Sequence, residues 1–314
     1  MHQVSKQKTY SMRETKTSTD EIGTLIDSFN NMLTEIEIRD TELSQANQEI
    51  SILNKRLSAE NLRLGAELDV ARQIQQMVLP RPAELQKIKG LEIVGFMQPA
   101  EEIGGDYYDV LQYEDRILLA IGDVTGHGLE SGVLMLMVQM AIRTLLVNEV
   151  KINELKTFLT TLNRALYQNA RRLDTDKNLT LCLLEYQQGI VRLTGQHEEV
   201  LVVRKDSTVE RVNTRPLGFM AIGLKLEIAK FINPAEVELQ IGDGMVLYTD
   251  GITEADSPEG ELYGLDKLCE VVSTHWSQSA LAIQQAVVAD VQRHIGEQNK
   301  NLDDITVVVF KRTE

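Results

Sequence analysis

A seven-residue repeat of apolar side chains constrains the N-terminal part of the chain more than any other feature. Between Asp20 and Leu79 there is no proline, only two glycines occur, and every seventh residue from Ile22 is apolar. The nine members of this series are Ile22, Phe29, Ile36, Leu43, Ile50, Leu57, Leu64, Ala71 and Val78. An ordinary α-helix drifts out of a strict seven-residue repeat, so the unbroken register predicts a coiled coil.

The second core position of the repeat is more polar. Four residues after each member of the first series except the last come Ile26, Leu33, Asp40, Asn47, Asn54, Asn61, Leu68 and Gln75. Paired amides fit a parallel two-stranded coil best, so we predict a parallel dimeric rod about 85 Å long, at about 1.5 Å per residue. Its polar seam is weak, and we expect it to change register or splay and thereby carry a signal. The alternative is one long amphipathic helix that lies on its own globular domain.

Pro80 and Pro82 end the predicted helix, and short β-like runs dominate from Leu91 onward. These runs include LEIAKFI (226–232) and the hairpin LVVRKDSTVERV (201–212), with helical stretches at 129–148, 152–171, 263–274 and 278–296. Helices that come in pairs and strands in hairpins favour an α+β fold, an antiparallel β-sandwich flanked by helices. The expected parts are a disordered or partial segment (1–19), the coiled-coil helix (20–79), a connector (80–90) and the globular domain (91–314).

Charge and cysteine content restrict the partners and the compartment. With 47 acidic and 32 basic residues, the net charge is −15 and no block of Lys or Arg occurs, so we expect neither nucleic acid nor anionic lipid as a partner. Cys182 and Cys269 stand in apolar settings, which predicts buried reduced thiols. No secretion signal is visible, and the apolar stretch 131–142 is too short to cross a bilayer. A cytoplasmic chain without a membrane segment is expected.

Four segments place an aspartate at the end of an apolar strand, beside glycine or a second acid. They contain Asp106 (IGGDYYD), Asp123 (LLAIGDVTGHG), Asp250 (VLYTDGITEA), and Asp303 with Asp304 (NLDDITVVVF). Each segment alone is typical of a turn. If the strand ends meet, however, the carboxylates converge without a nearby Lys or Arg, and such a cluster is tolerable only with cations.

The type of ligand indicates the metal. Carboxylates, backbone carbonyls and water suit Mg²⁺ or Mn²⁺, whereas the five histidines and two cysteines show no HxxxH or CxxC spacing for zinc. Gly104, Gly105 and Gly126 would let the backbone approach the ions and their substrate.

In order and context, these segments resemble the bacterial serine/threonine phosphatases of the PPM (type 2C) superfamily, in the branch of sporulation stage II protein E and the stress-response regulators. The matching stretches are PAEEIGGDYYDV, IGDVTGHGLESGVLM, LYTDGITEA and DDITVVV, and the resemblance covers about residues 91–314. ARQIQQMVLP (71–80) also resembles the helical linker that precedes such domains. DEIGTLIDSFNNM (20–32) looks like the second helix of a HAMP signalling module.

The resemblance implies a site for two Mn²⁺ or Mg²⁺ ions. Asp123 would bridge both ions, the carbonyl of Val124 would bind one of them, and Asp106 would hold that same ion directly or through water. A water molecule activated between the ions would attack phosphorus in line, so no phosphoenzyme is required.

The second ion of the resembled site would have its own acidic ligands. Asp250 and Asp303 would hold it, with Asp304 beside it.

Three features depart from the resembled family. In eukaryotic relatives a histidine near the bridging aspartate protonates the leaving group. His127 stands at a different spacing from Asp123. Two roles therefore remain open for it, this acid role and a structural role in the turn before residue 129. The phosphate-binding arginine of those relatives has no match near MQPAEE (97–102), which leaves phosphate to the metal alone or to a residue not identified. The stretch TGQHEEVLVV (194–203) departs from the Asn-Ala-Gly-His pattern of this branch, and we expect that to alter a strand edge or a partner contact, not the metals.

Two rival functions remain. A catalytically silent dimer could use the PPM fold only to bind a partner. A diguanylate cyclase is suggested by the Gly-Gly-Asp sequence, but Tyr107 and Tyr108 follow it here, and a cyclase has no use for TDG or DDIT.

The sequence therefore predicts a homodimeric, coiled-coil-linked, Mn²⁺/Mg²⁺-dependent serine/threonine protein phosphatase. The resemblance implies a phosphorylated STAS-domain anti-sigma antagonist as the substrate, and a helix pair (129–148 and 152–171) that switches one metal site when the coiled coil docks on it. Because the chain begins with half of a HAMP-like unit, we expect either a free-standing enzyme or the cytoplasmic part of a membrane receptor.

Overall fold

The chain divides into two compact units, Met1–Glu67 and Leu68–Glu314. The computed structural model describes residues 13–100, 103–126, 128–147, 155–174, 176–296 and 303–314. The domain boundaries expected from the sequence stay predictions.

A single helix, α2 (Glu21–Val78), spans 58 residues. Its start is fixed by Asp20, whose Oδ1 accepts hydrogen bonds from the backbone N–H groups of Ile22 (3.1 Å) and Gly23 (3.3 Å). Apolar heptad residues such as Ile50 and Leu57 are exposed along it in the single chain. The long helix is thus present, while its pairing and its HAMP character stay predictions.

Two five-stranded antiparallel sheets form the centre of the second unit. One sheet has the order β1-β10-β9-β6-β7 and the other β2-β3-β4-β5-β8. The strands of the first sheet are β1 (Leu91–Gln98), β10 (Ile305–Arg312), β9 (Gly244–Tyr248), β6 (Val200–Val203) and β7 (Val209–Val212). Those of the second sheet are β2 (Asp106–Tyr113), β3 (Arg116–Val124), β4 (Leu179–Gln187), β5 (Ile190–Gln196) and β8 (Ala235–Glu238).

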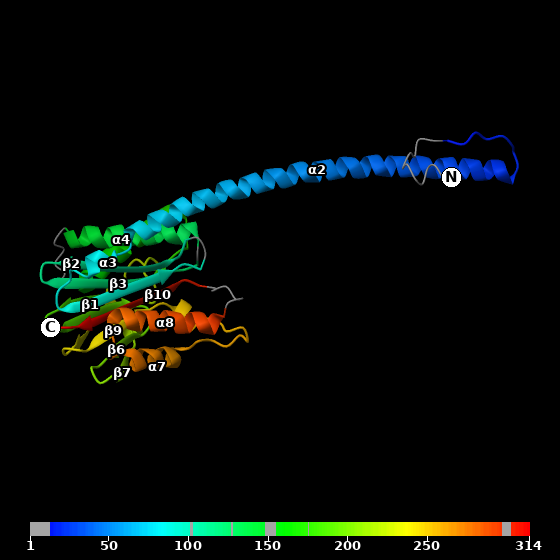
Figure 1. Cartoon of the computed structure of the whole chain (residues 1–314). Helices are drawn as coiled ribbons and strands as arrows, with labels where there is room; N and C mark the ends of the chain where they lie inside the picture. The colour runs from blue at the N-terminus through cyan, green and yellow to red at the C-terminus, as the bar shows by residue number, and fades with distance from the viewer. Residues whose placement is uncertain (1–12, 101–102, 127, 148–154, 175, 297–302) are drawn as a thin grey trace. The chain divides into compact units, whose positions relative to one another are not determined.

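Helices cover the outer face of each sheet, so that four layers result. As Figure 1 shows, α4 (Leu129–Val147) lies outside β2 and β3, whereas α7 (Leu265–His275) and α8 (Ala280–Ile295) lie outside the other sheet. Helix α5 (Leu155–Leu173) packs in the same core as α4. In β3, Leu119 and Ile121 face the core between the sheets, while Leu118 and Ala120 face the helices. Burial on both faces explains why this strand is a continuous apolar run. The predicted α+β sandwich is confirmed.

One predicted strand is wrong. Residues 226–232 form no strand but include a short 3₁₀ turn, η3 (Ala229–Phe231). Ile228 and Ile232 are both fully buried in the core beneath the helices, but Leu226 and Lys230, which would share their face in a strand, are exposed. The strand begins only after Pro234, as β8.

Among the described residues, α4 is the one helix long and apolar enough, by length and composition, to cross a membrane. The helix is longer than the apolar stretch 131–142 noted in the sequence. Met135, Val138 and Ile142 are fully buried in the core that α4 forms with sheet residues. Of the two cysteines, both free, Cys182 is fully buried and Cys269 is partly buried, so the expectation of two buried thiols holds fully only for the first.

Candidate active site

The two sheets bring all the predicted aspartates to one edge of the sandwich. In one sheet, β2 begins at Asp106, which lies opposite Asp123 near the end of β3. In the other sheet, Asp250 follows the end of β9, and the pair 303–304 precedes the start of β10. Since β9 and β10 are antiparallel neighbours, as are β2 and β3, each sheet contributes one carboxylate-bearing pair of strand ends.

Asp106 connects the two sheets. The residue is 1% exposed, and its Oδ2 accepts hydrogen bonds from the hydroxyl groups of Thr249 (2.7 Å), which follows β9, and Thr306 (2.5 Å), which lies in β10. Burial raises the pKa of Asp106 well above its usual value, and the charges of Asp123 and Asp304 raise it further, against the lowering effect of the threonine hydroxyls.

The remaining acidic side chains repel one another. Burial raises the pKa of Asp123 to about 8, with further contributions from the charges of Asp250, Asp303 and Asp304. Burial, Asp303 and Glu254 together raise the pKa of Asp250 to about 6. These shifts mean that the cluster disfavours its own ionised form unless positive charge is supplied.

Asp304 is already engaged by the backbone. Its Oδ2 accepts hydrogen bonds from the N–H groups of Gly105 (2.6 Å) and Asp106 (3.2 Å), and its Oδ1 accepts one from Ala100 (2.8 Å). A Cβ atom at Gly104 would lie 2.3 Å from Asp304 Oδ2. The carboxylate therefore fixes the segment before β2, and only glycine fits at position 104.

The second glycine of the pair opens space at the end of β3. A Cβ atom at Gly105 would lie 2.6 Å from the carbonyl oxygen of Val124 and 3.2 Å from Asp123 Oδ1. The Gly105 carbonyl in turn accepts a hydrogen bond from the Val124 N–H group (3.2 Å). The Val124 carbonyl and the Asp123 carboxylate are thus close together beside a position that must lack a side chain.

The donor set fits hard divalent cations. In the described parts of the chain, no group of three or more His, Cys, Asp or Glu side chains already has the arrangement of a metal site. The chemistry nevertheless matches, because the edge offers carboxylates and the Val124 carbonyl, the ligands preferred by Mg²⁺ and Mn²⁺. The raised pKa of Asp123 shows that these carboxylates need positive charge to ionise together.

Sequence reasoning missed the role of Gln75. It was assigned to the coiled-coil seam, yet its side chain is 2% exposed and pairs with the backbone of Gly104. Gln75 Nε2 donates to the Gly104 carbonyl (2.8 Å), and the Gly104 N–H donates to Gln75 Oε1 (3.2 Å). The sequence carries no signal that sets Gln75 apart, because Asp40, Asn47, Asn54 and Asn61 occupy the same heptad position.

A lysine side chain is hydrogen-bonded to the loop that follows Asp123. Lys177 Nζ donates to the Thr125 carbonyl (2.7 Å) and to Ser131 Oγ (3.2 Å). His127 belongs to this loop but lies outside the described residues, so neither of its two expected roles is decided.

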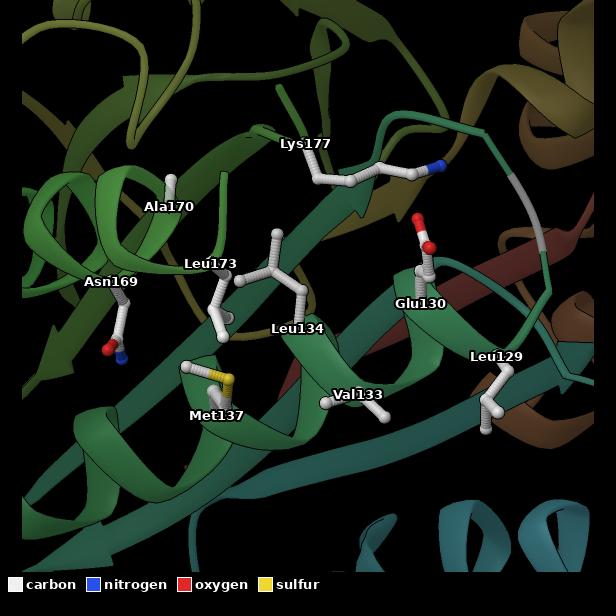
Figure 2. A pocket seen from close by; sticks show the side chains of 9 residues that line it. All are labelled: Leu129, Glu130, Val133, Leu134, Met137, Asn169, Ala170, Leu173 and Lys177. Carbon is white, nitrogen blue, oxygen red and sulfur yellow. The ribbon is translucent and has the colours of Figure 1, made fainter. Parts of the chain in front are cut away.

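A separate hollow of about 350 Å³ lies between α4 and α5. Figure 2 shows Leu134 and Leu173 pointing toward one another across it, with Met137 nearby and with Glu130 and Lys177 on its polar side. Its largely apolar lining does not suit a phosphate group.

Solved structures show which class of protein this architecture defines. The SiaA-PP2C domain of Pseudomonas aeruginosa superimposes with a TM-score of 0.69 at 22% identity, covering 81% of this chain and 98% of that domain. The RsbU and RsbW domains of Rv1364c from Mycobacterium tuberculosis give a TM-score of 0.58 at 22% identity, over 71% of this chain and 60% of that one. The fold is that of the PPM (type 2C) phosphatases.

The sequence identifies the family within that class. The model of the stage II sporulation protein E (SpoIIE) family matches residues 113–313, and the chain therefore belongs to this family of PPM-type serine/threonine phosphatases. Phosphoserine phosphatase RsbU of Bacillus subtilis is 25% identical over 256 residues, which is 78% of this chain and 70% of RsbU. Protein IcfG of Synechocystis is 24% identical over 272 residues, but the match spans only 41% of IcfG.

Proposed function

We propose that this phosphatase depends on two Mn²⁺ or Mg²⁺ ions and hydrolyses phosphoserine or phosphothreonine on a regulatory protein. The observation that carries the proposal is the meeting of carboxylates from both sheets at one edge, where Asp106 lies opposite Asp123, and burial with the charges of Asp250 and Asp303 raises the pKa of Asp123 to about 8. Divalent cations would relieve this repulsion, and PPM phosphatases as a family are metal-dependent.

The proposed ligands are those that the family resemblance implies, and the meeting of these carboxylates at one edge supports them. Asp123 would bridge the ions, the Val124 carbonyl and Asp106 (directly or through water) would bind one of them, and Asp250 and Asp303 would hold the other. When bound, the ions supply an activated water and stabilise charge on the phosphoryl oxygens.

Other groups of the chain hold these ligands in place. The Asp304 carboxylate accepts hydrogen bonds from three backbone N–H groups of the segment that leads into β2. We therefore assign Asp304 the role of positioning this segment beside the metal. Thr249 and Thr306 occupy Oδ2 of Asp106, and we assign its Oδ1 to the ion or to an ion-bound water.

The substrate we propose is a phosphorylated STAS-domain anti-sigma antagonist. The likeness to RsbU, a phosphoserine phosphatase, supports a phosphoserine substrate. The two free cysteines suit a reducing compartment, and we place the reaction in the cytoplasm.

Regulation is proposed to come through α2. Its heptad residues Leu43, Ile50 and Leu57 are 60%, 54% and 60% exposed in the single chain, which supports pairing with a second copy through a HAMP-like and coiled-coil helix. At the other end of the helix, the Gln75 pair with Gly104 provides a direct connection to the segment that precedes Asp106.

The function is tested with a phosphoserine-bearing STAS-domain protein and the full chain, with Mn²⁺ or with EDTA. We expect phosphate release only with Mn²⁺. Asp123→Asn should abolish it, with a loss of at least about a thousandfold, because the bridging carboxylate is the one ligand shared by both ions.

The controls separate chemistry from folding and from the rival functions. Asp115→Asn alters an exposed carboxylate in the β2–β3 turn, at the opposite end of these strands, and should leave turnover unchanged. Asp123→Asn should keep the wild-type circular dichroism spectrum. Wild-type protein that releases no phosphate with Mn²⁺ would instead support a silent scaffold, and turnover retained by Asp123→Asn would refute the bridging role.

A further inference from the structure

A histidine outside the predicted ligand set joins the two sheets directly behind the carboxylate edge. His197 follows the last residue of β5, where the chain crosses from one sheet toward β6 in the other. Its Nδ1 lies 2.7 Å from Thr180 Oγ1, and its Nε2 lies 3.1 Å from the carbonyl oxygen of Tyr248.

The partners of this ring determine its tautomer. The Tyr248 carbonyl can only accept, so Nε2 carries a proton and donates it. Burial lowers the pKa of His197 to about 4, which keeps the ring neutral at pH 7. In the neutral ring Nδ1 is an acceptor, and the Thr180 hydroxyl therefore donates to it.

Both partners are neighbours of a predicted ligand. Thr180 is the ladder partner of Asp123 in the β3–β4 pair, with its Oγ1 3.5 Å from the Asp123 carbonyl oxygen. Tyr248 is the last residue of β9 and stands two positions before Asp250. The imidazole thus connects the strand beside Asp123 with the strand that leads to Asp250.

The backbone of His197 is held as firmly as its ring. Its N–H donates to Thr214 Oγ1 (3.1 Å), and the Thr214 hydroxyl donates to its carbonyl oxygen. Thr214 itself is 1% exposed. The ring therefore has a fixed position from which to set the distance between the two sheets.

We propose that His197 is a positioning residue of the phosphatase site, because its neutral ring fixes the spacing between Asp123 and Asp250 that cation binding requires. The proposal rests on the proposed function and adds a residue to it. The sequence predicts that the departure of residues 194–203 from the Asn-Ala-Gly-His pattern alters a strand edge or a partner contact and not the metals, whereas the contacts of His197 connect this segment to both ligand-bearing strands.

The test compares metal binding by three full-length variants, using the electron paramagnetic resonance signal of free Mn²⁺. His197→Phe keeps a ring but removes both hydrogen bonds, and Thr180→Val removes one of them with little change of shape. Trp276→Phe is the control, because it removes a buried ring N–H bond to the Gly242 carbonyl (3.1 Å) at the opposite end of β9.

We expect His197→Phe to weaken Mn²⁺ binding by about 10- to 100-fold and Thr180→Val to weaken it less, since residues that orient metal ligands have effects of this size. In phosphate release, kcat at subsaturating Mn²⁺ should fall and recover at high Mn²⁺. Trp276→Phe should lower the Tm but bind Mn²⁺ like the wild type.

Unchanged Mn²⁺ affinity in both His197→Phe and Thr180→Val, with an active wild type, would overturn the positioning role alone. If His197→Phe does not fold, Thr180→Val decides by the same criterion. A wild type that neither binds Mn²⁺ nor releases phosphate would overturn the proposed function together with this inference.

Discussion

The acidic residues at the edge of the sandwich differ in what already balances their charge. Asp304 accepts three backbone N–H bonds, whereas burial, together with the charges of nearby carboxylates, raises the pKa of Asp123 to about 8. The first arrangement suits a residue that holds the backbone, and the second suits a residue that binds cations.

This difference predicts a link between pH, metal and stability. The folded pKa of Asp123, about 8, lies above its ordinary value of 3.8, so metal-free folded protein retains a proton that the unfolded chain has released. Its free energy of unfolding should therefore fall as the pH rises from about 4 to 8, by on the order of 1 kcal/mol per pH unit, and level off above pH 8. Bound cations remove this penalty.

Calorimetry with and without Mn²⁺ at pH 6 and pH 8 measures the effect. The increase in Tm caused by Mn²⁺ should be larger at pH 8, and in Asp123→Asn this difference between the two pH values should shrink. An equal or smaller increase at pH 8 in the wild type would contradict the assignment of Asp123.

The sequence could reveal which residue types lie at this edge but not their contacts. The pattern of Asp at strand ends beside glycine marked all the acidic positions, because strand ends and turn residues are local signals. That Asp304 serves the backbone depends on N–H groups about 200 positions away. The role of His197 likewise depends on Tyr248, which is 51 positions away, and no local pattern reports such contacts.

Among the elements, the C-terminal end of α2 contributes directly to the candidate site. The amide of Gln75 satisfies both backbone groups of Gly104, two residues before Asp106, and Gln139 Nε2 donates to the Val78 carbonyl (2.6 Å). The catalytic unit therefore includes the last turns of this helix, although the family match begins only at residue 113.

Replacing Gln75 tests this contribution. Gln75→Leu leaves the buried Gly104 N–H and carbonyl without partners, which should cost about 1–3 kcal/mol of unfolding free energy and lower kcat about tenfold. Gln73→Leu makes the same change at an exposed position of the same helix and should do neither. Urea denaturation and phosphate-release assays give both quantities, and equal behaviour of the two variants would remove Gln75 from the site.

Helices and most strands were predictable because burial sets a clear period in the sequence. Strand β3 reads as continuously apolar since both of its faces are covered, and α4 follows directly from its apolar composition. Residues 226–232 were predicted to form a strand because their apolar residues alternate like those of a strand. In the structure this stretch contains a 3₁₀ turn that buries Ile228 and Ile232 on one side.

At the scale of the whole molecule, the exposed heptad residues of α2 require an explanation beyond the single chain. Ile50 and Leu57 expose more than half of their surface, and a parallel partner helix would cover them. The sequence shows the repeat, but the number of chains in the assembly depends on contacts between copies.

A pair of double variants tests dimerisation. Ile50→Asp with Leu57→Asp places charges in the predicted seam and should produce monomers in sedimentation experiments, while the phosphatase unit stays folded. Ile52→Asp with Ala59→Asp places the same charges two residues later, away from the seam, and should remain dimeric. If both proteins sediment alike, the coiled-coil dimer is wrong.

The central claim is that carboxylates from both sheets share two divalent cations, and anomalous X-ray scattering from crystals grown with Mn²⁺ tests it most directly. Two anomalous peaks are expected at the edge of the sandwich, with Asp123 coordinating both and with Asp250 and Asp303 on one of them. The absence of Mn²⁺ from this edge in a protein that releases phosphate with Mn²⁺ would contradict it.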